Sequence, residues 1–452
     1  MIVLLSDLHL TDGSTARNVD PGAFELLHDE IVVNAKKKRA TELKVVLLGD
    51  ILDLVRTDYW AANIPYTQRP WNGTIDSTTG MNSNTTEVER QFNEVLGRIL
   101  RHASTTSLCS MLDSLALEAE HNGWPMELVF VVGNHDKALN NFASLRQRVQ
   151  ESFARAKPTF TSTLFAPEYA LLARHGHEWD TACHALEFWE KVLHEGERID
   201  RFDERLGRVM ALGEVVTAEL MSGFLHNCRV RFREAGLTSE QDRELLGGLT
   251  DVNNLRPMTD MFLWLRWFTR YNEERYTRPI AQALIDALDA LLESSHARAW
   301  DRIGSFDLTD QLALARSSLK LSGLDLAERV MQIASFFSAN TDELKEGARQ
   351  EFFSPHRDKR IRYIAYGHTH EARQDFFSGD RDPLMYVNTG TYLPFIQAAE
   401  EKRGFATAYR MTMAFFYNVN EDTQGRADRT PTVQVWNGIR RKNYAHPAPP
   451  IV

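Results

Sequence analysis

Short apolar runs that end in polar clusters recur along the chain. The runs Ile2–Leu5, Leu43–Leu48 and Glu127–Val132 are rich in β-forming residues and stop at small or acidic residues, which predicts buried strands. Between the first two runs, the apolar residues of Ala23–Arg39 recur at helical spacing. The sequence therefore predicts a strand–helix–strand unit whose two strands run parallel.

The same patterns continue to the C-terminus. We expect helical structure over Val88–Glu120 and strands that include Tyr169–Ala173, Ile361–Tyr366, Leu384–Val387, Thr407–Val419 and Thr432–Trp436. Between residues 180 and 355 there is little strand alternation, and helical spacing dominates. The predicted fold class is therefore α/β, with a core formed by residues 1–179 and 356–452 and a helical insertion or cap over 180–355.

Residues 56–87 differ in composition from the segments on either side. They are rich in Asn, Thr, Gly and Pro, and Tyr59, Trp60, Tyr66 and Trp71 are set among them. A long loop that leaves the end of a strand is a common place for binding residues. The alternative is an ordered surface loop whose aromatic side chains pack on the body of the protein. The sequence leaves both interpretations open.

Within the insertion, the segment Met261–Phe268 (MFLWLRWF) is apolar on nearly every face. Such a segment is most simply a helix that its neighbours bury. The sharper alternative is an apolar slot for an acyl chain, or a patch that rests on a membrane surface.

Composition narrows the functional classes. The chain has 452 residues, of which 43% are hydrophobic and 25% charged, and its net charge of −10 argues against a general electrostatic grip on nucleic acid or an anionic membrane. Three widely spaced cysteines do not make a disulfide framework. We see no signal peptide and no apolar run near the ~20 residues that cross a bilayer, so we expect a cytoplasmic protein without a transmembrane segment.

Polar clusters with the chemistry of metal ligands follow five of the predicted strands. They read DLH at Asp7–His9, GD at Gly49–Asp50 with Asp53 beyond, GNHD at Gly133–Asp136, HGH at His175–His177 and GHTH at Gly367–His370. In open α/β sheets the functional crevice lies beyond the carboxyl ends of the strands, so neighbouring strands would bring these clusters together. The glycines suit tight turns or a close approach of the backbone.

The donors in these clusters are carboxylates, imidazoles and one carboxamide: Asp7, His9, Asp50, Asn134, His175, His368 and His370. The set is too large for one four-coordinate ion, and it includes a carboxylate able to bridge. Two divalent ions about 3.5–4 Å apart that share a water or hydroxide account for it, and such a pair stabilises phosphoryl charge during in-line displacement at phosphorus. Mixed nitrogen and oxygen ligands suit Mn, Fe, Zn or Ni better than Mg or Ca, and we expect Mn²⁺ first.

The ordered set of motifs resembles that of the calcineurin-like metallophosphoesterases, over the predicted core but not over residues 56–87 or the insertion. The resemblance implies a four-layer αββα sandwich. It also implies a dinuclear-metal-dependent hydrolase that cleaves a phosphodiester or pyrophosphate bond by in-line attack of a metal-bridging hydroxide. By the family pattern, one ion is held by Asp7, His9, Asp50 and His370, and the other by Asp50, Asn134, His175 and His368.

The resemblance also implies roles for residues that bind no metal. His135 contacts the phosphoryl oxygen or protonates the leaving group, and Asp53 orients His135. His177 either replaces His175 as a ligand or contacts the substrate, and the His-Gly order favours His175 as the ligand.

Within the family, the segments HGHEWD and GDILDLVR look most similar to the UDP-2,3-diacylglucosamine pyrophosphatase-like branch, which splits a pyrophosphate in a nucleotide-linked lipid. The expected partner is then a nucleotide-linked or small phosphoester that Arg56 and His177 contact. The alternative within the family is a nuclease, in which Arg56 and Arg69 clamp a single strand of DNA or RNA that stacks on Trp60 and Trp71. The net charge disfavours this alternative.

A hypothesis of another class is a catalytically silent metal-binding scaffold that acts through the insertion. The complete ligand set and His135 argue against it, because a scaffold does not need a proton donor. The sequence predicts neither the oligomeric state nor the role of the insertion.

Overall fold

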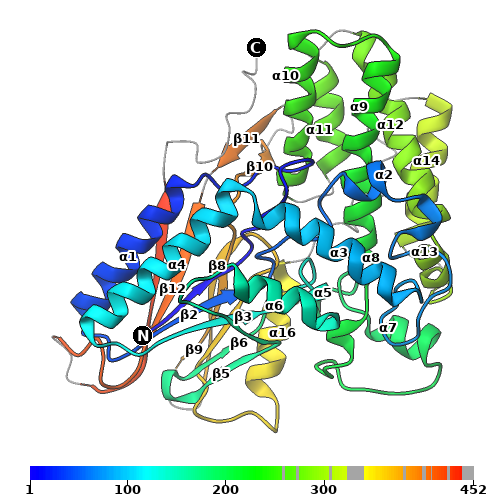
Figure 1. Ribbon diagram of the computed structural model, residues 1–452. Helices are drawn as coiled ribbons and strands as arrows, with labels where there is room; N and C mark the ends of the chain where they lie inside the picture. The colour runs from blue at the N-terminus through cyan, green and yellow to red at the C-terminus, as the bar shows by residue number, and fades with distance from the viewer. Residues whose placement is uncertain are drawn as a thin grey trace.

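The computed structural model describes residues 1–256, 260–270, 274–304, 308–322, 341–379, 383–399, 404–408, 410–424 and 428–439. Over these residues the chain is a mixed α/β protein, as the sequence predicts. Figure 1 shows the sheets on one side, with α1 (Gly22–Lys38) and α4 (Ala103–Asn122) lying across them, and a group of long helices on the other.

The first sheet has six strands within the described residues, in the order β13-β12-β1-β2-β3-β4. Strands β1, β2, β3 and β4 pair in parallel, whereas β12 is antiparallel to both β1 and β13. The bounds of these strands are β1 (Ile2–Leu5), β2 (Leu43–Leu48), β3 (Met126–Val131), β4 (Thr159–Thr161), β12 (Arg410–Tyr417) and β13 (Thr432–Ile439).

The second sheet has the order β5-β6-β7-β9-β8, with a parallel centre of β6, β7 and β9 and antiparallel strands at both edges. Strands β10 and β11 form a separate antiparallel pair. The bounds of these strands are β5 (Leu164–Ala166), β6 (Leu171–Ala173), β7 (Tyr363–Tyr366), β8 (Ala372–Phe377), β9 (Leu384–Thr389), β10 (Phe395–Ala398) and β11 (Phe405–Ala408).

Alternate residues of β1 point to opposite sides of the first sheet. Ile2 and Leu4 lie in an apolar layer that includes Leu171 and other residues of the second sheet. Val3 and Leu5 belong to a larger apolar cluster on the other side. The two sheets therefore pack face to face through the layer that holds Ile2 and Leu4.

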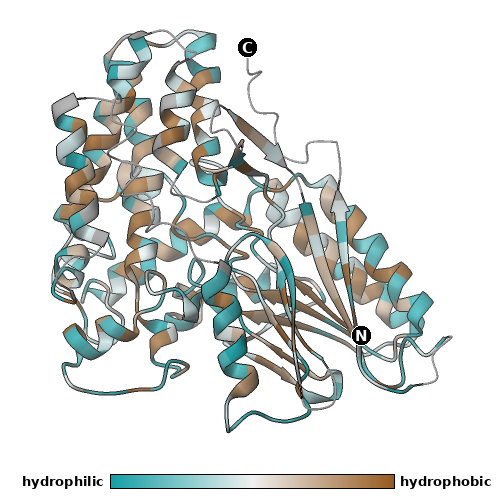
Figure 2. Cartoon of the chain, turned by 180° about the vertical axis from the view of Figure 1, so that it is seen from behind, coloured by the Kyte–Doolittle hydropathy of each residue, from teal (hydrophilic) through white to brown (hydrophobic). Residues whose placement is uncertain are grey.

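Helices cover the outer face of each sheet. Apolar residues of α1 and α4 belong to the cluster on the outer side of the first sheet. On the second sheet, Leu344, Ala348 and Phe352 of α16 (Thr341–Phe353) pack with Ile364 and Tyr386. Figure 2 shows the strands between these helices as largely brown, the colour of hydrophobic residues.

The other helices lie before and within the predicted insertion. Before residue 180 they are α2 (Tyr59–Asn63), α3 (Thr85–Leu100), α5 (Ala138–Asn141) and α6 (Ala143–Glu151). Within the insertion they are α7 (Leu186–Phe188), α8 (Leu212–Val215), α9 (Gly223–Glu234), α10 (Glu240–Leu249), α11 (Met261–Arg270), α12 (Glu274–Glu293), α13 (Ser295–Trp300) and α14 (Leu308–Ser322).

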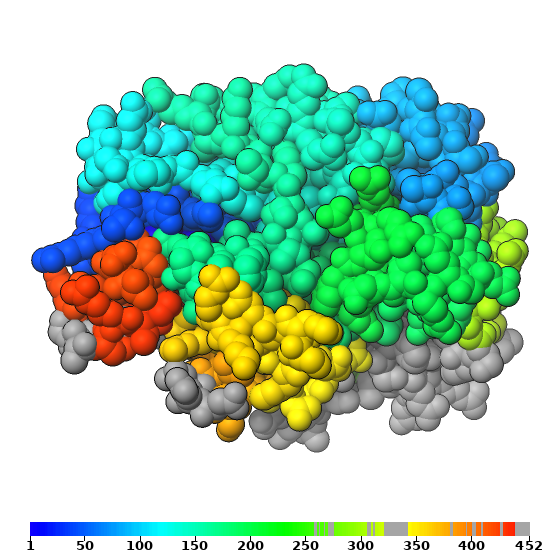
Figure 3. Space-filling model, turned by 90° about the horizontal axis from the view of Figure 1, so that it is seen from below, coloured from blue at the N-terminus to red at the C-terminus, as the bar shows by residue number. Residues whose placement is uncertain are grey.

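The helices of the insertion share one apolar interior with the first sheet. The same cluster contains Leu5 and Leu47 of the sheet and Leu212 and Phe224 of the insertion. In Figure 3 the green residues of the insertion and the yellow residues of the α16 region lie side by side on the lower face. The division into core and insertion stays a prediction, and residues 323–340 and 440–452 lie outside the described residues.

Segment 56–87 is an ordered loop whose tryptophans are packed inside. It contains α2 and the short turn Tyr66–Gln68. Trp60 is 1% exposed and Trp71 0% exposed, and their ring centroids lie 5.4 Å apart. Arg69 Nη1 forms an ion pair with Glu219 Oε2 at 2.7 Å. The nuclease alternative, in which a single strand stacks on these tryptophans and is clamped by Arg69, does not fit this arrangement, because all three side chains are buried.

Helix α11, which contains the apolar run, is also packed. Met261, Trp264 and Leu265 are buried in the large apolar cluster, and the ring of Trp267 lies 5.3 Å from that of Phe405. These described side chains serve helix packing, which favours the simpler of the two interpretations of Met261–Phe268.

One stretch of helix, Leu206–Glu234, is long and apolar enough to cross a membrane by length and composition, which the sequence reading did not anticipate. Within its most apolar window 89% of the residues are buried inside the molecule, and a core helix of a soluble protein passes the same test. It is weak evidence for a membrane span.

Candidate metal centre

The five polar clusters meet where strands of both sheets end. Main-chain hydrogen bonds join neighbouring strand ends, since Asp7 N donates to Gly49 O at 3.1 Å and His9 N donates to Asp50 O at 2.9 Å. Between the sheets, His368 N donates to Asp7 Oδ2 at 3.0 Å. These contacts make one centre from segments that are far apart in the sequence.

Much of the left-handed backbone in the molecule lies in this centre. Of the eight non-glycine residues with positive φ in the described chain, five are predicted ligands: Asp7 (51°), His9 (42°), Asp50 (53°), His368 (72°) and His370 (63°). Such residues avoid this region because of the Cβ atom, and strained backbone of this kind concentrates at functional sites.

The positive φ angles also show how Asp7 and His9 are brought together. Residues i and i+2 of an extended strand point the same way, but β1 ends at Leu5 and both residues are left-handed. They nevertheless converge, with His9 Nε2 at 3.8 Å from Asp7 Oδ1. The turn, and not the strand, brings the two donors together.

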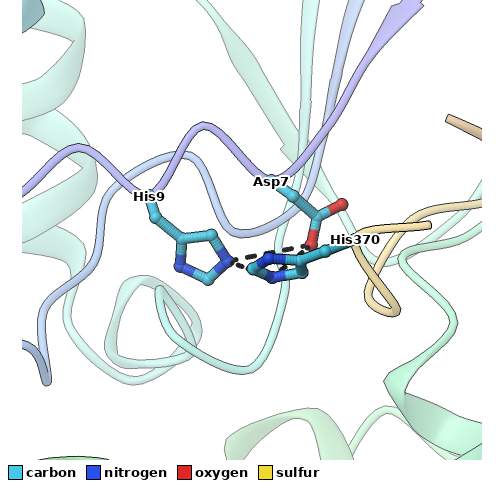
Figure 4. Close-up of side chains that lie close together, drawn as sticks. All are labelled: Asp7, His9 and His370. Atoms are coloured by element: carbon cyan, nitrogen blue, oxygen red, sulfur yellow. Dashed lines mark hydrogen bonds and ion pairs between the residues drawn. The ribbon is translucent and has the colours of Figure 1, made fainter. Parts of the chain in front are cut away.

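The first ligand group consists of Asp7, His9 and His370, with one donor atom of each within 4.8 Å of the others. Figure 4 shows the three side chains pointing toward one another. His9 Nε2 and His370 Nε2 lie 2.8 Å apart, and Asp7 Oδ1 lies 3.5 Å from His370 Nε2. Two ring nitrogens at this distance need a proton or a cation between them, which fits a metal position.

The second ligand group consists of Asp50, His175 and His368. His175 Nδ1 donates to Leu48 O at 2.9 Å, so its proton lies on Nδ1 and Nε2 faces the centre. Oδ1 of Asn134 is buried and has no hydrogen-bond partner. An unpartnered buried carboxamide oxygen is what a bound cation would satisfy.

Asp50 joins the two groups through one oxygen. Its Oδ1 accepts the main-chain N–H of His135 at 2.9 Å. Its Oδ2 lies 3.7 Å from His9 Nε2 and 3.2 Å from His175 Nε2, on the two sides of the centre. This is the position that a bridging carboxylate requires.

Asp53 contacts two histidines instead of the single one expected. Its Oδ2 accepts from His9 Nδ1 at 2.8 Å, and its Oδ1 lies 2.9 Å from His135 Nδ1. A carboxylate behind a ring fixes both its orientation and its tautomer. Asp53 therefore positions a predicted ligand as well as His135.

Two of the predicted glycines have a clear steric reason. Gly49 has φ +82°, and a Cβ atom there would overlap the ring of His175. A Cβ atom at Gly133 would lie 2.6 Å from Asp50 N and would overlap the Asp50 carboxylate. Both positions allow the close approach that the sequence suggested.

Burial keeps the two imidazoles of the first group neutral. Burial lowers the pKa of His9 to about 3, and burial together with the charge of Arg256 lowers the pKa of His370 well below its ordinary value. Both rings are neutral at pH 7, which is the form that binds metal. Burial also raises the pKa of Asp7 to about 6.

In the second group, the effect of a nearby carboxylate on the histidine pKa is larger than the effect of burial. Burial alone would lower the pKa of His175, but the carboxylate of Asp50 outweighs it and raises that pKa to about 10. Without metal, His175 therefore carries a proton that a bound ion would displace.

His177 lies next to the second group without joining it. Its ring centroid is 5.5 Å from that of His175 and 6.4 Å from that of His368. The structure thus brings His175, and not His177, to Asp50.

Arginine side chains add positive charge to the centre. Arg56 is buried beside Asp53, with Nε at 3.4 Å from Asp53 Oδ2, and its Nε and Nη1 have no hydrogen-bond partner. Arg256, which comes from the insertion, reaches His370 Nδ1 with Nη2. Sequence reasoning missed Arg256, because nothing near it in the sequence marks it as part of the centre.

Two further residues that sequence reasoning missed are Asp180 and Cys183. Asp180 Oδ2 lies 3.0 Å from His368 Nε2, and one donor atom each of Asp180, Cys183 and His368 lie within 4.8 Å of one another. Their position shortly after the HGH cluster was the only available signal.

Comparison with known proteins adds no assignment, since no protein-family model and no curated protein matches the chain.

Proposed function

We propose that the chain is a metal-dependent phosphoric ester hydrolase of the metallophosphoesterase type, which cleaves a phosphodiester or pyrophosphate bond. One observation carries the proposal: Asp50 Oδ2 stands between His9 Nε2 (3.7 Å) and His175 Nε2 (3.2 Å), so one carboxylate serves two ligand groups. The layer order of helix, sheet, sheet and helix supports the four-layer sandwich that the motifs imply.

The residues present fit two divalent ions. The first would be held by Asp7, His9, Asp50 and His370, and the second by Asp50, Asn134, His175 and His368. When bound, the ions would supply positive charge that stabilises the phosphoryl oxygens and lowers the pKa of an attacking water. Mn²⁺ is our first choice, because the donors mix nitrogen and oxygen.

His135 is suited to hold a proton at the edge of the centre. Its Nδ1 lies 2.9 Å from Asp53 Oδ1, and its Nε2 lies 4.0 Å from Asp50 Oδ2. Burial alone would lower the pKa of His135, but the charges of Asp53 and Asp50 outweigh it and raise that pKa. In our proposal Nε2–H hydrogen-bonds a phosphoryl oxygen or protonates the leaving oxygen.

Arg56 and Arg256 would hold the phosphoryl group from the protein side. A guanidinium group presents planar N–H donors that match phosphate oxygens. The buried Nη1 of Arg56, which has no hydrogen-bond partner, is available for this contact. Arg256 adds a second positive charge beside His370.

A polar cavity beside the first group is suited to the rest of the substrate. It has a volume of about 160 Å³ and is lined by His370, Glu371, Ala372, Thr391, Gln397, Arg410 and Thr412. Hydroxyl, amide and charged groups of this kind favour a sugar or nucleotide moiety over an acyl chain. We therefore propose a nucleotide-linked or small polar phosphoester as the substrate.

The test is hydrolysis by the purified full-length protein in the presence of Mn²⁺. Bis-p-nitrophenyl phosphate or p-nitrophenyl phosphate should be cleaved, and Asp50→Asn should abolish turnover because Asp50 belongs to both groups. Asp242→Asn is a matched control, since Asp242 is a buried carboxylate of α10 that bonds Ser239 and Tyr276 outside the centre. Asp242→Asn should keep full activity.

The alternatives give different results. Protein that carries two ions and turns over neither ester with any divalent metal would contradict the proposal and favour the scaffold. A preference for single-stranded DNA over a nucleotide-linked pyrophosphate, with binding that weakens steeply with salt, would favour the nuclease.

A further inference from the structure

A set of ligand-type side chains lies beside the second group and shares only His368 with it. It consists of Asp180, Cys183 and His368, each with a donor atom within 4.8 Å of the others. Asp180 is 9% exposed, and Cys183 is a half-buried free thiol. Of the three cysteines, Cys183 is the one that belongs to a potential metal-binding group in the described chain.

The turn that follows His177–Trp179 fixes the positions of the first two donors. Asp180 Oδ1 accepts the N–H of Ala182 at 2.8 Å, and Asp180 O accepts the N–H of Cys183 at 3.1 Å. The Sγ atom of Cys183 packs closely on Gly213, where a Cβ atom would lie only 2.7 Å from it. The carboxylate and the thiol are thus held toward the same side of the turn before any ion binds.

His368 completes the set from the other strand end. Its Nε2 lies 3.0 Å from Asp180 Oδ2. A nearby positive charge, the ammonium group of Lys137, lies 3.5 Å from Cys183 O. Its charge is compensated by Glu214, whose two carboxylate oxygens are both 3.2 Å from Nζ. Electrostatics therefore do not bar a cation from the space between Asp180, Cys183 and His368.

A second observation points to the same place. His177 is 6% exposed, and its Nδ1 is buried without a hydrogen-bond partner. Its ring centroid lies 6.4 Å from that of His368 and 6.5 Å from that of His184. This buried imidazole, whose Nδ1 lies 3.6 Å from Glu178 Oε2, is a further donor of the right type next to His368.

We propose that Asp180, Cys183 and His368 form an auxiliary metal position that takes a zinc-class ion through a thiolate, an imidazole and a carboxylate. Three protein ligands with one open position are common in zinc sites, and sulfur selects softer ions than the nitrogen and oxygen donors of the two main groups. On binding, the S–H bond of Cys183 breaks, a sulfur–metal bond forms and the proton leaves to solvent.

The auxiliary position and the second group share His368. A neutral imidazole offers one lone pair, so an ion in the auxiliary position takes the donor that the Asp50–His175 pair also needs. Excess zinc should therefore weaken metal binding in the second group. This consequence rests on the proposed function, whereas the auxiliary position itself does not.

Cobalt provides a test that reads the thiolate directly. Co²⁺ bound by a thiolate absorbs in the near ultraviolet through sulfur-to-metal charge transfer, which nitrogen and oxygen ligands do not give. Titration of the reduced full-length protein with CoCl₂ should produce this band, and Cys183→Ser should lose it. Cys109→Ser and Cys228→Ser are matched controls that should keep the band, because both thiols are buried away from the set.

A chemical protection experiment covers the case in which Cys183→Ser does not fold. In the wild type, Zn²⁺ should slow alkylation of Cys183 by iodoacetamide, as measured by peptide mass spectrometry, and added chelator should restore it. Unchanged alkylation at saturating Zn²⁺ would overturn the inference.

The outcomes separate this inference from the proposed function. Visible cobalt bands without charge transfer would mean that Co²⁺ occupies nitrogen and oxygen ligands only, which overturns the auxiliary position and leaves the hydrolase untouched. Charge transfer that depends on Cys183, in a protein without phosphoesterase turnover, would support the auxiliary position while the proposed function fails.

Discussion

Replacement of Asp53 by asparagine tests how the centre is built. The carboxylate is fully buried and divides between two rings, with Oδ2 accepting from His9 Nδ1 at 2.8 Å and Oδ1 lying 2.9 Å from His135 Nδ1. Asparagine keeps the size of the side chain, but only one end of the carboxamide accepts a hydrogen bond.

Main-chain N–H groups fix the orientation of the asparagine carboxamide. Asp53 Oδ1 accepts from the N–H of Arg56 at 2.9 Å and from that of Val55 at 3.3 Å, so the new oxygen must take this place. The NH₂ group then faces His9 Nδ1. To pair with it, His9 must move its proton from Nδ1 to Nε2, and Nε2 is the atom that faces Asp7.

The expected effect is a loss of metal affinity at the first group. Loss of the carboxylate behind a metal-ligating histidine weakens binding by about 10- to 100-fold, or about 1.4–2.7 kcal/mol. We expect the upper half of this range, because Arg56 Nε, now 3.4 Å from Asp53 Oδ2, would face an N–H group instead of an oxygen.

Calorimetric titration of metal-free protein with Mn²⁺ measures the effect. His135→Gln is the matched control, because it removes the other partner of Asp53 and leaves His9 in place. Its Mn²⁺ affinity should equal that of the wild type while its turnover falls. If Asp53→Asn binds Mn²⁺ as tightly as the wild type, the tautomer argument is wrong.

Three further substitutions probe other contacts. Gly133→Ala places a Cβ atom against Asp50, so it should lower the free energy of unfolding by about 1–3 kcal/mol and reduce the amount of bound metal. Urea unfolding and elemental analysis measure these two effects. Wild-type values for both would contradict the steric argument. Glu214→Gln leaves the buried ammonium group of Lys137 without its carboxylate and should lower the free energy of unfolding by about 3–5 kcal/mol, as measured by urea unfolding. The double variant with Lys137→Met should recover most of this free energy. Arg256→Ala should weaken inhibition by inorganic phosphate about 10- to 150-fold, since a charge-assisted hydrogen bond contributes about 1.5–3 kcal/mol. An unchanged inhibition constant would remove Arg256 from the phosphate site.

Local patterns predict the central strands well because those strands are buried on both faces. The predicted run Leu43–Leu48 has the bounds of β2, and Glu127–Val132 is displaced from β3 by one residue. Such strands are continuous apolar runs that turn residues terminate. Strand β8, in contrast, reads ARQDFF at an exposed edge of the second sheet, and its hydrophobic pattern is too weak to mark it.

The candidate ligands could be predicted for a related reason. Each follows directly on an apolar run, and the parallel strands β1 and β2 carry their carboxyl ends to one edge, which places Asp7 beside Asp50. His368 follows β7 of the second sheet, so its contact with Asp7 depends on how the two sheets pack. The second contact of Asp53, with His9, could not be predicted, since it depends on the left-handed turns that end β1 and β2.

The insertion shows most clearly what sequence patterns leave out. Its helices can be predicted from their spacing, but the polar contacts that join it to the centre link residues far apart in the sequence. Lys137, which follows the GNHD cluster directly, is held by Glu214 of α8, and Arg256 reaches His370 at the opposite side of the centre. Because both contacts are buried, displacing the insertion would leave the charge of Lys137 unpaired and would remove Arg256 from His370. The insertion is therefore part of the wall of the centre, and a truncated core would not reproduce that wall.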